Sequence, residues 1–578
     1  MRASDPTHDL RPATNGSSDP SPKILALISF AVSTIVLAHY YRYSQILLSG
    51  DAVAHINIAR RVFDSRTPGP MQLGTVWLPL QHVLTIPFIM LDVGWSSGVG
   101  GAIPSMLGYV LGVLGIYRLV RDGLRSRAAA WIAAVIYGAN PNLLYVQTTA
   151  LNEPLSMALL IWAVVWFADF TLAALTVAPP LSRPELERQG GDVPVAQRPA
   201  PRALHLCGLA LLANILLRYD GWFHACAFLA ATAIVLFIAH RCAPLTRAIK
   251  KAAWTFLFLV AIGPAAWFAW NAAIFGNPLE FATGPYSAKG IEERSRRLGD
   301  PHHPGWHAPR VAALYYLRDL QLNLGSGRLL VGPPKQTAFA PTAPPGRWEK
   351  PWLPIALFGT LVIIFLARGS WPLLLLWLPL PFYAISIAWG GVPIFIPVWW
   401  PFSYYNTRYA LQLLPAVALC WAAAAWLLMR AHRSPLWRAA VIAGTLVVVA
   451  ASYASIRYSV PITLREVRAN GGARSAIDAQ LATVLRRLPP DASILMYIGD
   501  HGGAFQRATI PLRRTIHEGN RDEWKAALQN PAASADYIIA ADGDSVSDAV
   551  RRHPEGLMIV GVVEAPWQRA VRIYRPIK

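Results

Sequence analysis

Long uninterrupted runs of apolar residues constrain this chain more than any other feature. Between positions 24 and 457 there are twelve such runs of 14 to 24 residues, and a helix needs about 20 mostly apolar residues to cross a bilayer. Charged residues make up only 15% of the 578 residues, against roughly 25% in soluble domains. The sequence therefore predicts a polytopic α-helical membrane protein and excludes an ordinary soluble enzyme. The runs are residues 24–41, 76–92, 99–119, 128–147, 154–176, 204–217, 221–239, 252–275, 351–367, 371–389, 408–429 and 436–457.

The charges between the runs indicate which side of the membrane each connection faces. Lys and Arg outnumber Asp and Glu by 52 to 32, and basic residues in short connections mark the cytoplasmic side. This excess points to membrane topology, so we expect no nucleic-acid partner. The basic connections are 118–127, 177–203, 240–251, 368 and 430–438, whereas 147–153, 218–220 and 390–407 are poor in net positive charge.

These connections alternate between the two sides only if run 76–92 does not cross the membrane. Its Pro79 and Pro87 favour a helix that lies along the surface or re-enters it. We therefore expect about eleven spans, with the N-terminus in the cytoplasm and the C-terminus outside the inner (cytoplasmic) membrane.

The runs also divide the chain into three parts. Residues 1–23 are polar and predict a disordered cytoplasmic tail. Residues 24–457 form the transmembrane domain, with outer loops 42–98 and 276–350. Residues 458–578 alternate helix-like stretches with short apolar strands, which is typical of a small α/β domain, here extracytoplasmic. The helix-like stretches are 473–488 and 522–529, and the strands are 493–498, 536–540 and 557–563.

A glycine-rich stretch, residues 499–503, follows the first of these predicted strands. It lacks the spacing of the dinucleotide-binding fingerprint. We interpret it as a plain turn between a strand and a helix.

Two acidic residues stand beside predicted spans on the same, outer side. Asp51 follows the first span and precedes His55 by four residues, so both side chains share a face if this stretch is helical. Glu153 opens the span 154–176. Either acid could simply satisfy a helix N-terminus, Asp51 as an N-cap. If both carboxylates converge on one cavity, they could act as general base and as a ligand for substrate or a divalent metal ion.

Two arginines lie at the same outer edge. Arg218 interrupts an apolar hairpin with Asp220 two residues later, and Arg408 opens a late span beside Asn406 and Tyr409. A guanidinium matches phosphate oxygens with a bidentate fork, which suits an anionic lipid head-group. The alternatives are an interfacial anchor or a local pair between Arg218 and Asp220.

Together these segments resemble the GT-C class of membrane glycosyltransferases. The chain looks most like the bacterial and archaeal relatives of glycosyltransferase family 39, which are related to protein O-mannosyltransferases and the lipid A aminoarabinose transferase. The likeness covers roughly residues 24–457. The segments that carry it are Gly50-Asp51 with His55, Ala59-Arg60-Arg61, Trp77-Leu78-Pro79-Leu80, Thr148 to Pro154, Asn271 to Phe281, and Asn406-Thr407-Arg408-Tyr409.

The resemblance implies a polyprenyl-phosphate-linked sugar donor, cleaved on the outer face with inversion at the sugar. Membrane lipids and this donor are then the expected partners. We expect catalytic roles for Asp51, Glu153 and His55, with His55 supporting Asp51 or meeting the substrate. The expected substrate-binding residues are Arg60, His82, Arg218, Asp220, Asn406, Arg408 and Tyr409.

Two departures from the family pattern bear on a metal site. Many members carry two adjacent acids in the first outer loop, whereas Asp51 is followed by Ala52, and Glu153 stands where relatives often have Asp. The rival functions are a transporter or flippase of lipid-linked saccharides and a non-catalytic envelope-assembly protein. Convergence of Asp51, Glu153 and Arg408 on one outward cavity would favour the enzyme.

Overall fold

The computed structural model describes residues 19–74, 76–175, 200–284, 287, 289–290, 302, 305–325, 347–391, 406–566 and 568–577. Most of the predicted tail 1–23, most of connection 177–203, and large parts of 276–350 and 390–407 lie outside these ranges.

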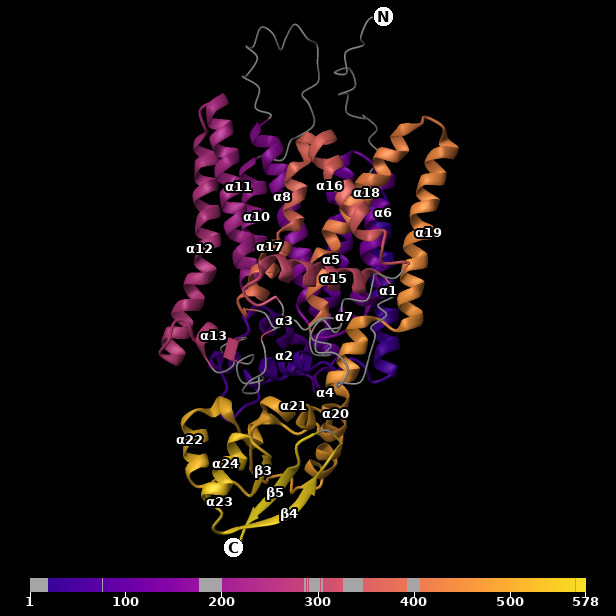
Figure 1. Ribbon diagram of the computed structural model, residues 1–578. Coiled ribbons are helices and arrows are strands. Elements are labelled where there is room, and N and C mark those ends of the chain that lie inside the picture. The colour runs from indigo at the N-terminus through magenta and orange to yellow at the C-terminus, as the bar shows by residue number, and fades with distance from the viewer. Residues whose placement is uncertain are drawn as a thin grey trace, which may run out of the picture.

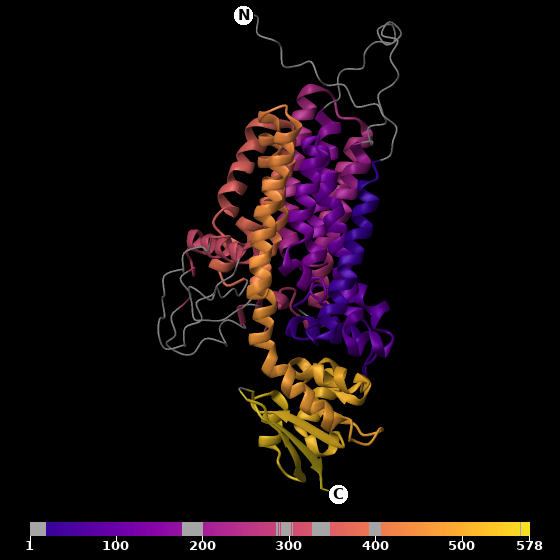
Figure 2. The same cartoon turned by 90° about the vertical axis from the view of Figure 1, so that its right-hand side faces the viewer.

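An elongated bundle of helices forms the larger part of the molecule, with the C-terminal residues packed at one end (Figures 1 and 2). Within the described ranges, eight helical segments are long and apolar enough to cross a membrane. These are α1 (Ser21–Arg42), α5 (Val99–Leu124), α8 (Glu153–Leu175), α11 (Asp220–Cys242), α12 (Arg247–Phe275), η2 (Arg368–Trp377) with α17 (Pro379–Ala388), η3 (Thr407–Leu413) with α18 (Leu414–Ala431), and α19 (Pro435–Ser459), which runs on into α20 (Ile462–Leu485).

Three further expected spans are shorter helices. They are α6 (Arg127–Gly138), α10 (Ala200–Ile215) and α16 (Trp352–Leu366), with 12, 16 and 15 residues. The protein is therefore a multi-pass helical membrane protein, while the number of eleven spans stays a prediction.

The prediction of one continuous helix over 128–147 is wrong. The chain leaves α6 at Ala139 and begins a new helix, α7 (Pro141–Val146). The Asn140 side chain caps α7 by accepting the backbone N–H groups of Asn142 and Leu143, both at 3.0 Å. Pro141 cannot donate a backbone hydrogen bond and suits the first position of a helix. Asn140 and Pro141 therefore start a second helix where apolar composition alone suggested continuity.

A layer of short elements lies between the bundle and the C-terminal residues (Figure 1). The predicted surface segment 76–92 contains α3 (Leu80–Ile89), whose ten residues span about 15 Å, half the thickness of the hydrocarbon core. A helix of this length cannot cross the membrane by itself. The layer contains α2 (Gly50–Arg61), η1 (Pro70–Leu73), α3 (Leu80–Ile89) and α4 (Asp92–Ser97); α13 (Glu280–Thr283) and α15 (Pro309–Leu324) follow later in the chain.

The C-terminal residues fold into a five-stranded mixed sheet with helices around it, in the strand order β2-β1-β3-β5-β4. Strand β1 is parallel to β2 and β3, and β5 is antiparallel to β3 and β4. The sequence did not reveal β2, which has only two residues, or β5. The elements are β1 (Ile494–Met496), α21 (Ile498–Ala508), η4 (Leu512–Arg514), β2 (Thr515–Ile516), η5 (Glu518–Asn520), α22 (Asp522–Gln529), α23 (Pro531–Ser534), β3 (Tyr537–Ala541), α24 (Ser545–Arg552), β4 (Leu557–Val563) and β5 (Val571–Pro576).

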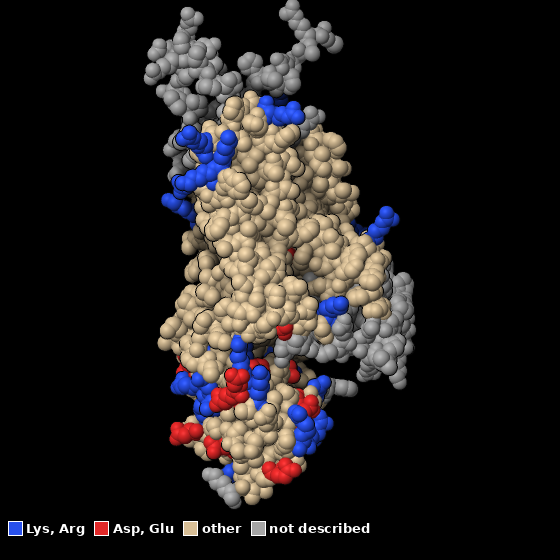
Figure 3. Space-filling model, turned by 90° about the vertical axis from the view of Figure 1, so that its left-hand side faces the viewer, with Lys and Arg blue, Asp and Glu red and all other residues tan. Residues whose placement is uncertain are grey.

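The surface has the charge distribution of a membrane protein. On the face in Figure 3, Lys and Arg gather at the end of the bundle remote from the C-terminal residues, and acidic side chains mixed with further Lys and Arg cover the C-terminal end. The surface between them is mostly uncharged. Large apolar side chains are exposed on the bundle, among them Leu27 at 70% and Trp254 at 71%. A band of this kind suits contact with lipid tails.

The charge pattern predicts that the C-terminal residues lie outside and connection 177–203 inside. A reporter fused after Lys578 and one inserted within 177–203 should therefore report opposite sides of the membrane. A control insertion within 430–438 should agree with the one in 177–203. If the first two reporters gave the same side, the predicted orientation would have to be abandoned.

Candidate functional site

A cavity of about 1490 Å³ lies where the bundle meets the C-terminal residues. Its walls come from α2, the N-terminal ends of α8 and α11, α17 and η3, and on the other side from α20, α21 and the turn between β3 and α24. Eight of the predicted site residues line this cavity. One of them is His55. The other seven are Asp51, Glu153, Arg218, Asp220, Asn406, Arg408 and Tyr409.

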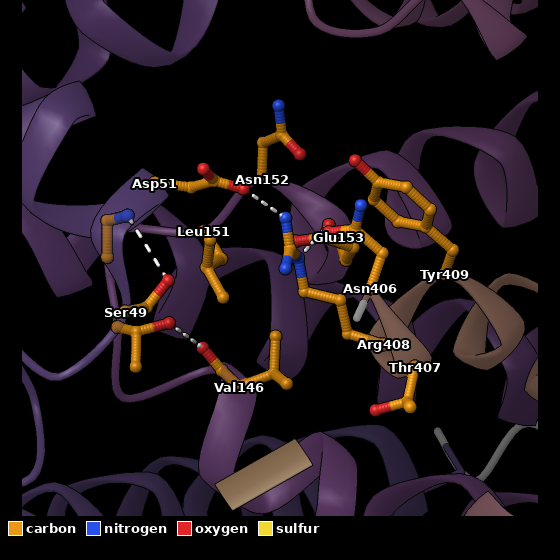
Figure 4. A network of polar contacts seen from close by, with 12 residues as sticks. Ser49, Asp51, Val146, Leu151, Asn152, Glu153, Asn406, Thr407, Arg408 and Tyr409 are labelled. Atoms are coloured by element: carbon orange, nitrogen blue, oxygen red, sulfur yellow. Dashed lines mark hydrogen bonds and ion pairs between the residues drawn. The ribbon is translucent and has the colours of Figure 1, made fainter. Parts of the chain in front are cut away.

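Arg408 lies at the centre of the polar wall, between two carboxylates (Figure 4). Its Nε donates to Glu153 Oε1 at 2.8 Å, and its Nη2 donates to Asp51 Oδ2. The Arg408 side chain is 8% exposed and that of Glu153 1%, whereas Asp51 keeps 39% of its side chain exposed. The structure thus brings together three residues from α2, α8 and η3 that the sequence placed at the outer ends of separate spans.

Arg218 adds a second guanidinium to the same carboxylate. Its Nη1 donates to Glu153 Oε1 at 3.2 Å and to Asn152 Oδ1 at 2.7 Å. Its Nη2 donates to the Tyr383 hydroxyl at 2.7 Å, and its Nε to Asp220 Oδ2 at 3.0 Å. The local pair with Asp220 therefore exists, but it is one part of a larger network. The carbon at the centre of each guanidinium, of Arg218 and of Arg408, also lies 5.0 Å from the ring centre of Tyr409, a cation–π distance.

The alternative that Asp51 serves as an N-cap is wrong. Ser49 is the N-cap of α2, and its Oγ accepts the backbone N–H of Ala52 at 3.4 Å (Figure 4). Asp51 lies in the first turn, where the helix dipole favours a negative charge. Because Ser49 satisfies the helix end, the Asp51 carboxylate is directed to Arg408 and the cavity.

His55 does not support Asp51 in the way the sequence suggested. Its Nδ1 is 2.9 Å from Nε2 of His82, and its ring centre is 4.6 Å from that of Trp77. Burial, with a smaller contribution from the positive charges of Arg408 and Arg218, lowers the pKa of His55 to about 3. His55 is therefore neutral at physiological pH. His82 is fully buried behind it and does not line the cavity, so its position does not support the expected contact with substrate.

Arg60, another expected substrate ligand, lies outside the cavity. Its Nε donates to Asp64 at 2.8 Å and its Nη2 to Asp92 at 2.7 Å. Its Nη1 donates to the carbonyl of Ile89 at 2.8 Å, and its guanidinium stacks 4.6 Å from the ring centre of Trp95. Arg60 therefore fastens the end of α2 to the segment between α3 and α4, a structural role that corrects the prediction.

Sequence reasoning missed several residues of this site. Tyr383 is an isolated polar group in an apolar run, and nothing in the sequence around it indicates a site residue. Glu466 on α20 contacts the backbone beside Arg408. Its position in an ordinary helix of the C-terminal part did not indicate this contact either. The interpretation of stretch 499–503 as a turn before a helix is wrong, because these residues lie inside the first turns of α21, where residues 499–502 line the cavity. The place of this stretch after a strand was predicted, but its proximity to Arg408 and the cavity was not.

The two carboxylates suggested as metal ligands do not fit a metal ion. Both Asp51 and Glu153 are bound to Arg408, so a cation between them would have to displace the guanidinium. Within the described ranges, no group of three or more His, Cys, Asp or Glu side chains is arranged to hold a metal ion.

The whole fold resembles known membrane proteins at low sequence identity. The crystal structure of ArnT from Cupriavidus metallidurans bound to undecaprenyl phosphate matches with a TM-score of 0.54 and 14% identity, over 96% of this chain and 98% of that chain. The apo structure of the same protein matches with a TM-score of 0.51 and 13% identity over the same shares. The chain has the GT-C fold.

This fold is the one that the resemblance in the sequence motifs led us to expect. Because the match covers nearly all of both chains, it includes the C-terminal residues as well as the bundle. No family model matches the sequence. No curated protein matches it either.

The geometry of this site predicts unequal effects on stability. Replacing Glu153 by Ala leaves two buried guanidinium groups without their shared carboxylate, and breaking a buried pair costs about 3–5 kcal/mol. Asp51→Asn should cost about 1 kcal/mol or less, because exposed pairs contribute little. Thermal unfolding of the purified variants in detergent measures both effects.

The exposed Asp522 on α22, whose side chain is 100% exposed, supplies a matched control. Asp522→Asn should leave the melting temperature unchanged. Equal shifts for Glu153→Ala and Asp51→Asn would contradict the different burial of the two carboxylates.

Proposed function

We propose that this protein is a membrane glycosyltransferase that moves a sugar from a polyprenyl-phosphate-linked donor to an acceptor on the outer face of the cytoplasmic membrane. The observation that carries the proposal is the convergence of Asp51, Glu153, Arg218 and Arg408 on one cavity. The residues of this site come from four separate parts of the chain.

Asp51 is the proposed catalytic carboxylate. It is the more exposed of the two carboxylates that hold Arg408, so an acceptor in the cavity can reach it. The acceptor hydroxyl oxygen attacks the anomeric carbon of the sugar and its proton passes to Asp51. The bond from that carbon to the phosphate oxygen breaks at the same time, and the polyprenyl phosphate leaves with the electron pair. Attack opposite the leaving group inverts the sugar.

Arg408 and Arg218 are the proposed phosphate-binding groups. Negative charge grows on the phosphate oxygen as the sugar bond breaks, and fixed positive groups in a partly buried site stabilise that charge. Glu153 holds both guanidinium groups in one place. In this proposal Glu153 orients the two arginines, and Asp220 and Tyr383 fix the rest of Arg218.

The position of the cavity supports a donor with a lipid tail. Glu153 begins α8, Asp220 begins α11, and Arg408 lies just before α18, so the polar groups stand where apolar helices start. A polyprenyl chain can then lie along the bundle while its phosphate reaches the arginines. The structure of ArnT bound to undecaprenyl phosphate supports the same class of lipid for this chain.

The first functional prediction concerns Asp51. A positioned base contributes about 10²–10⁴-fold to a rate, so Asp51→Asn should lower sugar transfer by that range while the fold is kept. The measurement is transfer from a polyprenyl-phosphate sugar by purified variants of matched thermal stability. Wild-type turnover in Asp51→Asn would remove Asp51 from the mechanism.

The second functional prediction concerns Arg408. Arg408→Ala removes both the charge and the fork and should lower kcat by about 10²–10³-fold. Arg408→Lys keeps the charge but loses the planar fork, so its activity should lie between those of the wild type and the Ala variant. Initial rates at varied donor concentration separate kcat from KM. Unaltered activity in both variants would leave Arg408 as a structural anchor only.

A further inference from the structure

A buried glutamate outside the cavity holds the backbone that carries Arg408. Glu466 lies in the first turns of α20, is 4% exposed and does not line the cavity. Its Oε2 accepts the backbone N–H of Thr407 at 2.9 Å and the Thr407 hydroxyl at 2.7 Å. Its Oε1 accepts the backbone N–H of Asn406. One carboxylate therefore takes three hydrogen bonds from the two residues before Arg408.

The backbone conformation of Asn406 needs an external constraint. Asn406 has a φ of +57°, in the left-handed region that costs most residues free energy and that asparagine tolerates better than others. A chain held in this conformation turns sharply just before Arg408. The hydrogen bonds to Glu466 favour this turn because they fix two backbone N–H groups and the Thr407 hydroxyl to one buried side chain.

The other side of Thr407 is held by asparagines from distant helices. Its carbonyl accepts Nδ2 of Asn323 at 2.9 Å, and the carbonyl of Asn323 accepts Nδ2 of Asn142 at 3.1 Å. Asn142 Oδ1 in turn accepts the backbone N–H of Thr463 at 3.1 Å and its hydroxyl at 3.0 Å. Thr463 and Glu466 lie on the same turn of α20, so the contacts form a closed ring around Thr407.

We infer that Glu466 is a positioning residue for Arg408, through which the first helix of the C-terminal part sets the geometry of the phosphate-binding arginine. The inference rests on the proposed function. Glu466 hydrogen-bonds to residues 406 and 407, while Arg408 meets Glu153 and Asp51. A shift of the 406–407 turn therefore moves the guanidinium relative to both carboxylates.

The test is a double-mutant cycle. Glu466→Gln keeps the size of the side chain but replaces one acceptor oxygen with a donor, and misplacement of about 1 Å can cost up to 10²-fold in rate. We expect its kcat to fall roughly 10- to 100-fold, with a weaker affinity for undecaprenyl phosphate added as a probe. In an Arg408→Lys background, Glu466→Gln should cause little further loss of kcat. The guanidinium that Glu466 positions is already absent there.

Glu349→Gln is the matched control. Glu349 is also buried, at 1% side-chain exposure, and pairs with Arg318 at 2.5 Å outside the cavity. Its replacement should leave undecaprenyl phosphate binding unchanged and should lower activity, if at all, equally in both backgrounds. Equal losses from Glu466→Gln in the wild-type and Arg408→Lys backgrounds would overturn the inference, as would unchanged kcat and affinity.

Hydrogen exchange separates failure of this inference from failure of the proposed function. If the wild-type protein neither binds undecaprenyl phosphate nor transfers sugar, the proposed function fails. Faster amide exchange over residues 406–413 in Glu466→Gln, but not in Glu349→Gln, then still supports the positioning role, and unchanged exchange there refutes it. The exchange measurement needs no substrate, and both variants are compared at matched thermal stability.

Discussion

The buried guanidinium of Arg408 is the interaction on which the rest of the site depends. A charge removed from water is tolerated only when it is paired and hydrogen-bonded. Here the pairing groups come from α2 and from the start of α8, so burial of one side chain requires two other elements to approach it. The guanidinium of Arg218, in the turn before α11, is also buried and also needs a paired carboxylate, which Glu153 supplies. The polar end of the bundle is therefore organised by charge, whereas the rest of the bundle is organised by apolar packing.

The C-terminal residues take part in this organisation. They supply one wall of the cavity through α20, α21 and the turn after β3, and α20 also reaches the backbone beside Arg408. Arg61 on α2 pairs with Glu518 of η5 at 3.1 Å, which fastens the short outer elements to the C-terminal residues. A description of the site that ended with the last membrane helix would omit one side of its wall and one of its supports.

The sequence allowed a large part of the site to be predicted. Asp51, Glu153 and Arg408 are charged residues at the ends of apolar runs, and such charges are costly unless they are paired or functional. The alternation of basic connections put all three on one side. The meeting of these three residues could be expected from their common side, because helices that end on one side of a membrane bring their terminal residues into one layer.

Other features could not be predicted because they depend on contacts between distant residues. Arg60 has the same sequence signature as a substrate ligand, and only its contacts with Asp92 and Trp95 reveal its structural role. The pairing of His55 with His82 required knowledge of how α3 packs on α2. No neighbouring residue in the sequence distinguishes Glu466 from a solvated glutamate in a helix. The break before α7 depends on a capping asparagine inside an apolar run.

The ring around Thr407 also has a consequence for how the protein is made. Thr407 and Glu466 are 59 residues apart, and Asn142 and Thr463 are 321 residues apart. A ribosome delivers the chain from its N-terminus, so Arg408 enters the membrane before the helix that fixes it has been synthesised. Helix α20 follows the apolar helices α18 and α19 in the chain, so both are made before it. Assembly of the site is therefore a late event in biogenesis, and a chain that stops after α19 carries every cavity-lining residue of the bundle without a fixed Arg408.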